Sequence, residues 1–517
     1  MSVFTVSFLS CVLSGFMVDT KEIVNLCKRR GFVFQSSEIY EGISGFWDYG
    51  PLGILLKNNI RDSWWSRMVI ASPIGPDNKP ISIVGLDSSI IQHPNTWKAS
   101  GHLDGFSDIM TDCKDTKKRY RVDQLIVVIE KNMLLAEDNK CGYVFNLEDG
   151  QDVISKRIKK LGGKYSDENF EVISLEKIPY ESYVFLYAPD SNKIGTLTEP
   201  KPFNLMFQTN VGPVSSDSNI SYLRPETAQG IFLNFKNVID STKVRIPFGI
   251  AQIGKAFRNE VNPRNFLFRT REFEQMELEF FCHPKDAVTW HEFWIQERNN
   301  WWNSIGIQNS NLKLRKQEVE ELAHYAKNGN GTVDIEYQFP FTEPNYGEIE
   351  GISHRSNFDL TTHQNLSKKT LTYRDVITNE KFIPDVIEPS AGLNRGFLAL
   401  LFSAYTEDKN RPSQFYMNFP FHIAPVKAAI FPLTNNTEEI QLAERLYMEI
   451  RKKFNCEFDS KQSIGKRYAR ADEIGVPYCI TIDSQSCIDN TITIRDIKTM
   501  AQRRIGIEYV MDFLNNQ

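Results

Sequence analysis

The sequence predicts an α+β protein, with a large domain built on an antiparallel sheet and a smaller α/β domain at the C-terminus. The 517 residues, 41% hydrophobic and 24% charged, are too many for one ordinary globular core, so two or three domains are expected. Residues 248–281 have the period-two alternation of an antiparallel hairpin, and strands alternate with helices after Pro420. A mixed fold with a large and a small domain follows from these observations.

The hairpin at 248–281 is expected to carry a binding surface. Its first strand should run over 248–260 and end in Phe-Arg-Asn-Glu, and the loop 261–265 contains typical turn residues. One face of the return strand combines two arginines, an aromatic ring and a carboxylate. Such a face suits a flat polyanion, because arginine binds phosphate and an aromatic ring stacks on a base. The residues of this face are Arg269, Arg271, Phe273, Gln275 and Glu277.

The first residues, 1–17, are apolar and lack a preceding positive charge. We expect an upstream extension or a misassigned start, with an organellar leader as the alternative. A helix should follow from Lys21 to Arg30, capped by Asp19 and ended by Gly31. No later segment reaches the length of a membrane span.

Residues 52–199 begin with a core helix. Residues 52–68 have helical spacing of apolar side chains, and a strand is expected in the following ISIVGLDSSIIQHP. The polar stretch 93–122 holds the basic cluster KKRYR at 117–121, for which a solvated surface is the default. Residues 124–199 mix short strands with a basic helix and are expected to form an inserted subdomain.

Three carboxylates in the second half of the large domain need a structural reason. The motif RPET at 224–227 should open a helix, with its proline in the first turn and Glu226 near the positive end of the helix dipole. A second insertion, expected to be mainly helical, should occupy 284–345. Beyond it, Glu348 and Glu350 should lie on one face of a strand, where two carboxylates require a cation beside them.

The segment IEPSAGLNRGFLALLFSAY predicts a strand that bears Glu388 and Ser390, a turn at Gly392 and then an apolar helix. Arg395 lies in the first turns of this helix. An arginine there needs an anion, which is either the phosphate of a ligand or a nearby protein carboxylate.

Residues 421–517 are expected to form a separate α/β domain. Strands in APVKAAIFPL, CEFD, YCITID and TITIRD accompany the helix EEIQLAERLYMEIRKKF, and a final helix should follow from about Ile497. A loop leading into another helix adds the basic residues Lys466, Arg467 and Arg470. On composition alone this is a generic α/β module.

Several classes of site are excluded by the sequence. The eight cysteines contain no Cys-x-x-Cys pair and the eight histidines no His-Glu-x-x-His motif, so neither zinc nor a disulfide framework is expected, and a reducing cytosolic setting fits. No G-x-x-x-x-G-K-[ST] loop is present, so a nucleotide must be held in another way. The net charge of −5 argues against non-specific coating of nucleic acid, although a local basic patch could still bind RNA.

Two motifs resemble those of the class II aminoacyl-tRNA synthetases. Phe-Arg-x-Glu at 257–260, a loop, and Arg-x-x-x-Phe-x-x-x-Glu at 269–277 resemble motif 2 of this family. The short motif alone would fit any hairpin with a charged face, but the loop and the second half in register make the pattern specific. The strand, turn and helix around Gly392 resemble motif 3, and RPETAQG together with Glu-Pro-Ser resembles the glycyl-tRNA synthetases of the α2 type.

The resemblance implies the division of the chain. It covers most of 32–517 apart from the two insertions. An extension over 1–17 would precede an antiparallel-sheet class II catalytic domain over 18–420, with helical or mixed insertions at about 124–199 and 284–345. The α/β domain over 421–517 would bind the anticodon.

The implied activity is that of a glycine–tRNA ligase, which activates glycine with ATP to the adenylate and transfers it to the 3′ end of tRNA. Implied partners are ATP, glycine, tRNA and a second copy of the chain, which would meet it through the helix at 52–68. The implied setting is cytoplasmic, without a membrane, with Mg²⁺ carried by ATP and without zinc. Two alternatives stay open: another class II enzyme of threonyl, prolyl or histidyl specificity, or a non-catalytic synthetase-like protein that binds nucleic acid. Arg258, Glu260 and Arg395 together argue against the second.

The resemblance also implies residue roles at the nucleotide. Arg258 would bridge the α-phosphate and the amino acid carboxylate, Arg395 would hold the γ-phosphate, and Glu348 would bear Mg²⁺; these three are the expected catalytic residues. Phe273 would stack on adenine, while Asn394 stands where the broader class usually has an acid. The expected ATP-binding residues are Arg258, Asn259, Glu260, Phe268, Arg269, Thr270, Arg271, Glu272, Phe273, Glu348, Ile349, Gly392, Leu393, Asn394 and Arg395.

For the amino acid, the resemblance implies a site closed by Glu226, Glu388 and Ser390, whose two carboxylates also neutralise the ammonium group. Walls against the α-carbon suffice to select glycine, because every competitor is larger. The expected glycine-binding residues are Arg121, Glu226, Phe273, Glu274, Gln275, Met276, Glu277, Glu388, Pro389, Ser390, Ala391 and Gly392.

Overall fold

The computed structural model divides into two compact units. The first comprises Met1–Ile90, Glu226–Ala256 and Arg264–Gln517, and the second comprises Ile91–Pro225 and Phe257–Pro263. The expected extension at 1–17 lies outside the described residues. The structure describes residues 18–131, 141–147, 149–163, 165–166, 169–213, 219–342 and 346–517.

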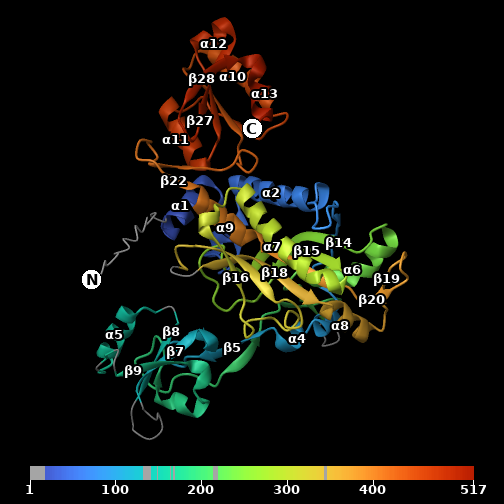
Figure 1. The fold of residues 1–517 in the computed structure, drawn as a ribbon. Coiled ribbons are helices and arrows are strands. Elements are labelled where there is room, and N and C mark those ends of the chain that lie inside the picture. The colour runs from blue at the N-terminus through green and yellow to red at the C-terminus, as the bar shows by residue number, and fades with distance from the viewer. Residues whose placement is uncertain are drawn as a thin grey trace, which may run out of the picture. The chain divides into compact units, whose positions relative to one another are not determined.

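The first unit is organised around a seven-stranded sheet in the order β16-β17-β18-β21-β15-β14-β3. Four of its strands, β16, β18, β15 and β14, are labelled in Figure 1. Successive neighbours from β16 to β15 pair antiparallel, and β3 joins β14 as a parallel edge strand. The sheet confirms the predicted α+β class. Its strands are β3 (Ser82–Gly85), β14 (Phe248–Phe257), β15 (Glu272–Cys282), β16 (Leu312–Lys316), β17 (Thr332–Tyr337), β18 (Gly347–Ser356) and β21 (Asp385–Gly392).

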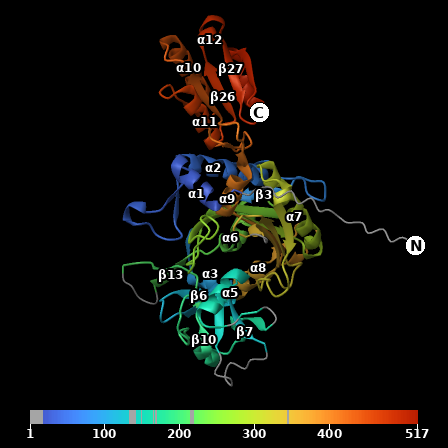
Figure 2. The same cartoon turned by 90° about the vertical axis from the view of Figure 1, so that its left-hand side faces the viewer.

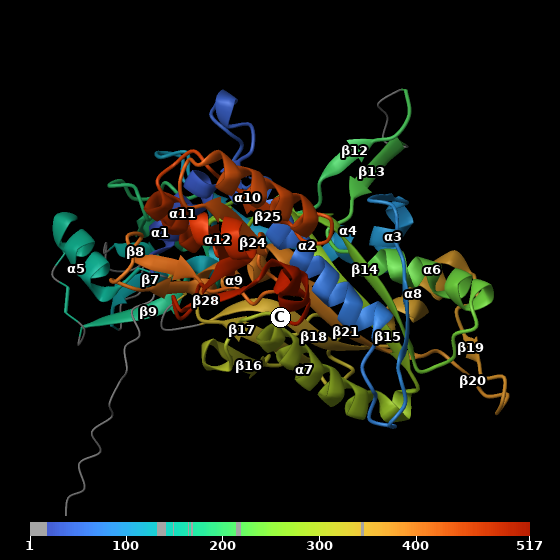
Figure 3. The ribbon, with the colours of Figure 1, turned by 90° about the horizontal axis from the view of Figure 1, so that it is seen from above.

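Three helices, α2 (Pro51–Trp65), α7 (Ala287–Ser304) and α9 (Leu393–Ala404), cover one face of this sheet. Their apolar side chains share a single hydrophobic core with Met276 and Leu278 of β15. Figure 2 shows α2 beside α9, and all three helices can be followed against the strands in Figure 3. This side of the sheet is therefore the apolar side, which we call the back face.

The opposite, front face is partly covered by α6 (Ala228–Ser241) and α8 (Phe358–Ser367), which pack on Phe248 and Phe281. The expected start of α6 was wrong by about three residues. Thr227 occupies the N-cap position, so the proline and Glu226 of the RPET motif precede the helix. Glu226 thus lies in the chain that leads into α6, above the front face.

The hairpin strands are shorter than expected. β14 ends at Phe257 and β15 begins at Glu272, so Arg269 and Arg271 precede the return strand. Arg269 instead forms an isolated bridge with Arg264, and the backbone N–H of Arg271 donates to Gly45 O at 2.8 Å. The long connection between the strands is therefore held by its own turn and by the loop after β1.

The prediction that 284–345 is a mainly helical insertion was wrong. The range holds α7 and also β16 and β17, both of which belong to the seven-stranded sheet. The aromatic residues of α7 suggested a core helix, and Trp294 and Trp302 are indeed fully buried. The alternating strand pattern after α7 is short and was missed.

The N-terminal part follows the sequence closely. Helix α1 (Thr20–Arg30) begins after Asp19, whose carboxylate accepts from Lys21 N at 3.0 Å, and it ends at Gly31 with φ of 77°. The expected continuous strand after α2 is two short strands, β3 and β4, in different sheets. The chain also forms two-stranded pairs from β1 (Val33–Gln35) and β2 (Trp47–Tyr49), β19 (Tyr373–Arg374) and β20 (Lys381–Phe382), and β22 (Tyr405–Glu407) and β23 (Phe415–Met417).

The second unit contains three smaller sheets, in the orders β10-β8-β7-β9, β11-β5-β6 and β12-β13-β4. The basic helix predicted near 151–160 is present as α5 and packs on the first of these sheets through Ile154 and Ile158. The elements of this unit are α3 (Pro94–Ala99), α4 (His102–Gly105), α5 (Gln151–Lys160), β4 (Ile91–Gln92), β5 (Ser107–Asp112), β6 (Arg119–Arg121), β7 (Leu125–Glu130), β8 (Gly142–Asn146), β9 (Phe170–Ser174), β10 (Leu186–Tyr187), β11 (Lys201–Asn204), β12 (Gln208–Asn210) and β13 (Ile220–Leu223).

The C-terminal part of the first unit is a five-stranded sheet in the order β25-β24-β26-β27-β28. The helix expected from about Ile497 begins later, because β28 (Gln502–Gly506) comes first and pairs with β27. Within the described ranges, none of the helices combines the length and apolar character that a bilayer crossing requires. The other elements are β24 (Ala428–Pro432), β25 (Cys456–Phe458), β26 (Tyr478–Ile482), β27 (Thr491–Asp496), α10 (Thr437–Ile450), α11 (Ile464–Ile474), α12 (Ser484–Asp489) and α13 (Val510–Asn515).

Replacement of Gly53 by alanine should destabilise the large domain. Near the start of α2, a β-carbon at Gly53 would overlap the backbone carbonyl of Phe32, which cannot move aside as a side chain could. Such overpacking costs about 3 kcal/mol. Gly465, near the start of α11, is the matched control, since a β-carbon there meets no atom within 4 Å. Thermal unfolding should show a clear loss for Gly53→Ala and none for Gly465→Ala; equal melting temperatures would contradict this packing.

Candidate active site

The front face of the sheet carries a row of polar side chains from β15. Because side chains alternate along a strand, Gln275, Glu277 and Glu279 point away from the back-face core that holds Met276 and Leu278. Phe273 belongs to the same alternate set. Three buried polar groups in a row on one strand require partners from the neighbouring elements.

Strand β21 and the start of α6 each supply a partner for Glu277. Ser390 lies opposite Glu277 in the register, and its hydroxyl donates to the Glu277 carboxylate at 2.8 Å. The hydroxyl of Thr227, at the start of α6, donates to the other oxygen of Glu277. On the far side of β21, Ser353 of β18 lies opposite Glu388. Glu388 therefore occupies the middle of the front face.

Arg355 on β18 is the buried cation of this face. Its Nη1 donates to Glu388 at 2.7 Å, and its Nε and Nη2 donate to Asp359 of α8 at 2.7 and 2.9 Å. Nη2 is also 4.0 Å from Glu226. The guanidinium group lies 3.7 Å from the centre of the Tyr325 ring. These contacts fix the plane of the guanidinium group.

Gln229, in the first turn of α6, ties the cluster together. Its amide nitrogen donates to Glu226 at 2.9 Å and to Asp359 at 3.0 Å, and its amide oxygen is 2.8 Å from Nε2 of His363. Helices α6 and α8 are thereby linked through one amide. The position of Glu226 follows from this link rather than from the helix dipole.

Negative charge exceeds positive charge in this cluster, which we call the carboxylate cluster. Burial raises the pKa of Glu277, Glu279 and Glu388, neighbouring carboxylates raise it further, and Arg355 opposes these effects. Both carboxylate oxygens of Glu279 are buried without a hydrogen-bond partner among the described residues. A cation that donates hydrogen bonds would be stabilised here. The five acids of the cluster are Glu226, Glu277, Glu279, Asp359 and Glu388.

Three members of the carboxylate cluster have the spacing of metal ligands. One oxygen each of Glu277, Glu279 and Glu388 lies within 4.8 Å of the others. Glu277 and Glu388 already accept hydrogen bonds from Ser390 and Arg355. An ammonium group, which needs acceptors from several directions, fits the remaining oxygens better than a closed metal shell does.

A second group lies where β21 passes into α9. Arg395 Nε donates to Phe268 O at 3.0 Å, and Nη1 donates to the Glu348 carboxylate at 3.0 Å and to its backbone carbonyl at 2.9 Å. The guanidinium group lies 4.5 Å from the centre of the Phe268 ring. The expected anion for Arg395 is thus a protein carboxylate in this structure, and both side chains remain partly exposed. Asn394 accepts from the backbone N–H of Glu274 at 3.2 Å.

The expectation that Glu348 and Glu350 share one face was wrong. The register of β17 and β18 shifts at this point, so that Glu350 lies opposite Ile335 and Glu348 lies opposite Glu336. Residues two positions apart in a regular strand point to the same face. Here Ile349 is an extra residue without a partner on β17, so the alternation is broken and Glu348 and Glu350 point to opposite faces. Glu350 points to the back face, where Arg298 and Trp302 of α7 each donate to it at 2.6 Å.

Glu348 has an acidic neighbour that the sequence did not reveal. Burial, followed by the charge of Glu348, raises the pKa of Asp334 to about 7. Arg315 binds Asp334 at 2.9 Å and Glu336 at 2.8 Å. An oxygen-rich and partly exposed site of this kind suits a hard cation such as Mg²⁺.

Other expected residues lie away from the carboxylate cluster. Glu274 points to the back face, where its carboxylate binds Lys57 at 2.7 Å and Arg61 at 3.3 Å. Glu272 pairs with Lys255. The side chains of Met276, Pro389 and Ala391 belong to the back-face set of their strands, and those of Met276 and Ala391 lie in its core.

The second unit contains four of the expected residues, Arg121, Arg258, Asn259 and Glu260. Nε of Arg258 donates to Pro225 O at 3.1 Å, and its guanidinium group lies 5.3 Å from the centre of the Phe106 ring. Arg121 pairs with Asp108 at 3.1 Å and Asp123 at 2.7 Å, so two carboxylates balance its charge. The backbone N–H groups of Asn259 and Glu260 donate to Leu205 O and Arg258 O, at 2.7 Å each.

Sequence reasoning missed Arg355, Asp359, Gln229 and Glu279. The first two are spaced as i and i+4, but a strand and a helix meet between them, and nothing in the local pattern marks that junction. Glu279 carried a signal, because it continues the alternation from Glu277 into an otherwise apolar run.

Known proteins resemble this chain over its whole length. A family model described as an anticodon binding domain matches residues 427–517. The glycine–tRNA ligase of Rhodopirellula baltica is 45% identical and covers 96% of this chain and 98% of its own length. The glycine–tRNA ligase of Thermobifida fusca is 43% identical, and the match covers 95% of this chain and 96% of the relative. The enzyme of Borrelia garinii is 42% identical, and the match covers 97% of this chain and 98% of the relative.

Solved structures agree on the fold. A prolyl-tRNA synthetase of Giardia lamblia in complex with prolyl-adenylate superposes with a TM-score of 0.59 at 12% identity, covering 96% of this chain and 76% of that one. A Cryptosporidium parvum prolyl-tRNA synthetase gives 0.57 at 10% identity, covering 96% and 77%. At such identities the likeness concerns the fold.

Replacement of Glu279 by glutamine should change stability in a pH-dependent way. A carboxyl whose pKa is raised in the folded state holds a proton there that the unfolded chain releases, so its contribution is favourable at low pH and is lost as the pH rises. Glutamine keeps the shape of the protonated acid and cannot ionise. The melting temperature of Glu279→Gln should be close to that of the unmodified protein at pH 4, below the ordinary pKa of a glutamate, and exceed it at pH 8. A constant difference between the two pH values would show that Glu279 does not titrate with folding.

Proposed function

The chain belongs to the glycine–tRNA ligase family of class II aminoacyl-tRNA synthetases, and we propose that the carboxylate cluster around Arg355 is its glycine site. It is an aminoacyl-tRNA ligase that joins glycine to tRNA with ATP. The relatives that share 42–45% of its sequence are glycine enzymes, so the threonyl, prolyl and histidyl alternatives are set aside. These relatives match nearly the whole chain and are glycine–tRNA ligases, which also argues against a non-catalytic nucleic-acid-binding descendant.

The excess of buried carboxylates carries the proposal for glycine. Five acids face one guanidinium group, and an incoming ammonium group supplies the positive charge and the hydrogen-bond donors that Glu279 lacks. Glu226, Glu388 and Ser390 form the walls around the α-carbon. Since every other amino acid adds atoms at that carbon, steric exclusion gives the selectivity without a separate editing site.

The nucleotide would be bound by cationic and aromatic residues near the start of α9 and in the motif 2 segment. Arg395 already contacts Glu348 and the Phe268 ring, and an incoming γ-phosphate would compete with Glu348 for its guanidinium group. We assign Arg258 to the α-phosphate and the glycine carboxylate, and Phe273 and Glu260 to adenine. Each assignment follows the motif in which the residue stands.

ATP-dependent chemistry in this family usually requires Mg²⁺, and the donor set around Glu348 fits such an ion. Glu348 would hold it, with Asp334 close by. When bound, the ion neutralises charge on the phosphate oxygens. When the triphosphate enters and takes the place of Glu348 at Arg395, the Glu348 carboxylate would become free to bind the ion.

The reaction needs little covalent chemistry from the protein. The glycine carboxylate attacks the α-phosphorus and pyrophosphate leaves. A ribose hydroxyl at the 3′ end of tRNA then attacks the carbonyl carbon of the adenylate and loses its proton, and AMP leaves as the bond from that carbon to the phosphate oxygen breaks. Negative charge builds on the α-phosphoryl oxygens in the first step, and Arg258 would stabilise it. Positioning and charge stabilisation provide the rest.

The remaining parts of the chain would serve tRNA and assembly. We propose a catalytic domain over 18–420 with an insertion at about 124–199, and an anticodon-binding domain over 421–517; residues 284–345 contribute α7, β16 and β17 to the catalytic domain itself. Of the basic residues expected to face tRNA there, Lys466 and Arg470 are exposed. Arg467 is buried and donates to the backbone carbonyls of Pro432 and Asp459, so its role is structural.

We further propose a cytoplasmic homodimer in which α2 and the segment after it meet a second copy. Ile70 and Ile74, which follow α2, are 76% and 55% exposed. Apolar side chains at this level of exposure next to a helix of the expected dimer contact favour burial by a partner.

Glycine alone among the twenty amino acids should support ATP–pyrophosphate exchange by the purified protein. Exclusion at the α-carbon predicts that alanine and serine give less than about one hundredth of the glycine rate, since a clash with buried walls costs several kcal/mol. Exchange supported equally well by proline, threonine or histidine would disprove the glycine assignment.

Replacement of Arg258 by alanine should abolish glycine-dependent exchange. Loss of a charged contact made in the transition state costs about 3–4 kcal/mol, or a factor of 10²–10³ in rate. Arg119→Ala is the matched control, because Arg119 is an exposed arginine of the same unit that pairs with Asp112. Both variants should melt like the unmodified protein, and exchange at the normal rate by Arg258→Ala would remove this residue from the mechanism.

A further inference from the structure

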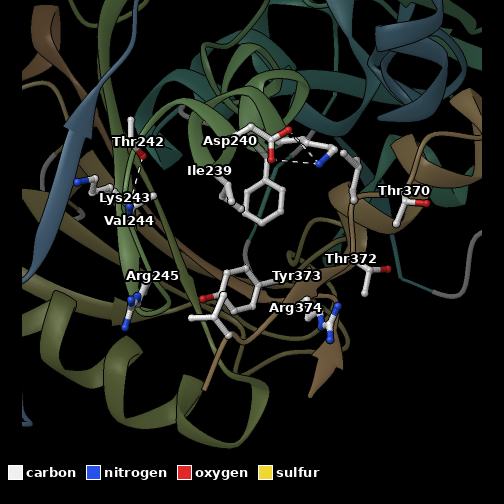
Figure 4. Close-up of a pocket in the computed structure, with 14 residues that line it drawn as sticks. Ile239, Asp240, Thr242, Lys243, Val244, Arg245, Thr370, Thr372, Tyr373 and Arg374 are labelled. Atoms are coloured by element: carbon white, nitrogen blue, oxygen red, sulfur yellow. Dashed lines mark hydrogen bonds and ion pairs between the residues drawn. The ribbon is translucent and has the colours of Figure 1, made fainter. Parts of the chain in front are cut away.

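A pocket of about 430 Å³ lies at the C-terminal end of α6, in the first unit (Figure 4). The helix begins at the carboxylate cluster and runs for 14 residues, which separates its two ends by about 20 Å. The pocket is lined by the last turns of α6, by residues 242–245, and by residues 370–374 and 376 around β19. It is therefore distinct from the proposed glycine site.

The lining of this pocket is strongly cationic. It holds Lys236, Lys243, Arg245 and Arg374, against the single carboxylate of Asp240. Lys236 is neutralised by Asp240, at 3.0 Å in an i,i+4 pair on α6. The other three cations are exposed, and Figure 4 shows the Arg245 and Arg374 guanidinium groups on either side of the pocket in this view.

These three positive charges are only weakly compensated. Among the described residues, Lys243 has no ion pair, and Arg374 donates to the neutral amide oxygen of Asn379 at 2.8 Å. Arg245 lies near Asp375, whose pKa is lowered first by the backbone N–H groups of Thr378 and Ile377 and only then by this arginine. A local positive field results, although the chain as a whole carries −5.

The floor of the pocket adds the other features of a phosphate ester site. Phe235, Leu371 and Tyr373 are buried beneath it, and Thr370 and Thr372 line it with hydroxyl groups. Arginine, lysine and hydroxyl donors around an apolar floor bind the phosphate and sugar of a nucleic acid backbone. The volume is enough for one or two such groups.

We propose that this cationic pocket binds phosphate groups, and that the tRNA backbone supplies them. The second part rests on the function proposed above, because it takes tRNA as the substrate. Free polyphosphates offer the same chemistry, and the experiment separates the two sources. An enzyme with a net negative charge needs local cationic contacts to attract RNA, and this pocket supplies three.

The test is the salt dependence of tRNA binding by the triple variant Lys243→Gln, Arg245→Gln, Arg374→Gln. Removal of three phosphate contacts should make the slope of log K against log salt shallower by about 2–3 and weaken binding about tenfold or more at physiological salt. The control Lys236→Gln, Asp240→Asn lies in the same pocket but removes an already neutral pair, so its slope should be unchanged. A triple variant with the unmodified slope would overturn the proposal.

Acetylation of Lys243 in the unmodified enzyme, followed by mass spectrometry, identifies the source of the phosphate without any variant. Protection by tRNA but not by millimolar tripolyphosphate supports the RNA backbone, and protection by tripolyphosphate alone keeps the phosphate site but rejects tRNA as its ligand. Protection by neither overturns the proposal, as does a Lys243 that is unreactive without ligand, which would indicate a protein surface over the pocket.

Glycine-dependent exchange separates this proposal from the proposed function. It requires no tRNA and should be the same, within about twofold, in the triple variant and the unmodified enzyme. Absence of exchange in the unmodified enzyme would reject the proposed function. The phosphate site would then be tested by whether tripolyphosphate protects Lys243 from acetylation.

Discussion

The ion network around Arg355 is the interaction on which the front face depends. A guanidinium group that is fully buried must be paired, and Arg355 is paired with Glu388 and Asp359 in a fixed geometry. These pairs hold β18, β21 and α8 against each other. The same network leaves more carboxylate than it neutralises, and this surplus would favour the ammonium group of glycine at the proposed site.

The sheet separates two kinds of chemistry by its alternation. On the back face, Met276 and Leu278 join the core beneath three helices, while one residue away Glu277 and Glu279 face the carboxylate cluster. A rigid apolar layer directly behind the site restricts how far the acids can move. Positioning of a small substrate such as glycine requires this restraint, because few contacts are available to orient it.

The shift in register between β17 and β18 at Ile349 gives Glu348 and Glu350 different roles. Without it, Glu348 and Glu350 would act together on one face. With it, Glu350 becomes a buried acceptor for Arg298 and Trp302, and Glu348 stays on the front face beside Arg395. The two arginines consequently differ in their availability to a ligand. Arg298 is buried in the core with Glu350, whereas Arg395 pairs with a partly exposed carboxylate that a phosphate of ATP could replace.

The motifs, the antiparallel sheet and the small α/β domain can be read from local spacing: the alternation of β15, the capped helix α1, and the strand, turn and helix around Gly392. The resemblance of their motifs also groups Glu226, Glu277, Glu388 and Ser390. The contributions of Arg355, Asp359 and Gln229 to this group, and the back-face positions of Glu274 and Glu350, become visible only in the folded chain. Partners of a buried charge come from elements distant in the chain, and a single register shift, which no local pattern records, reverses the face to which a side chain points.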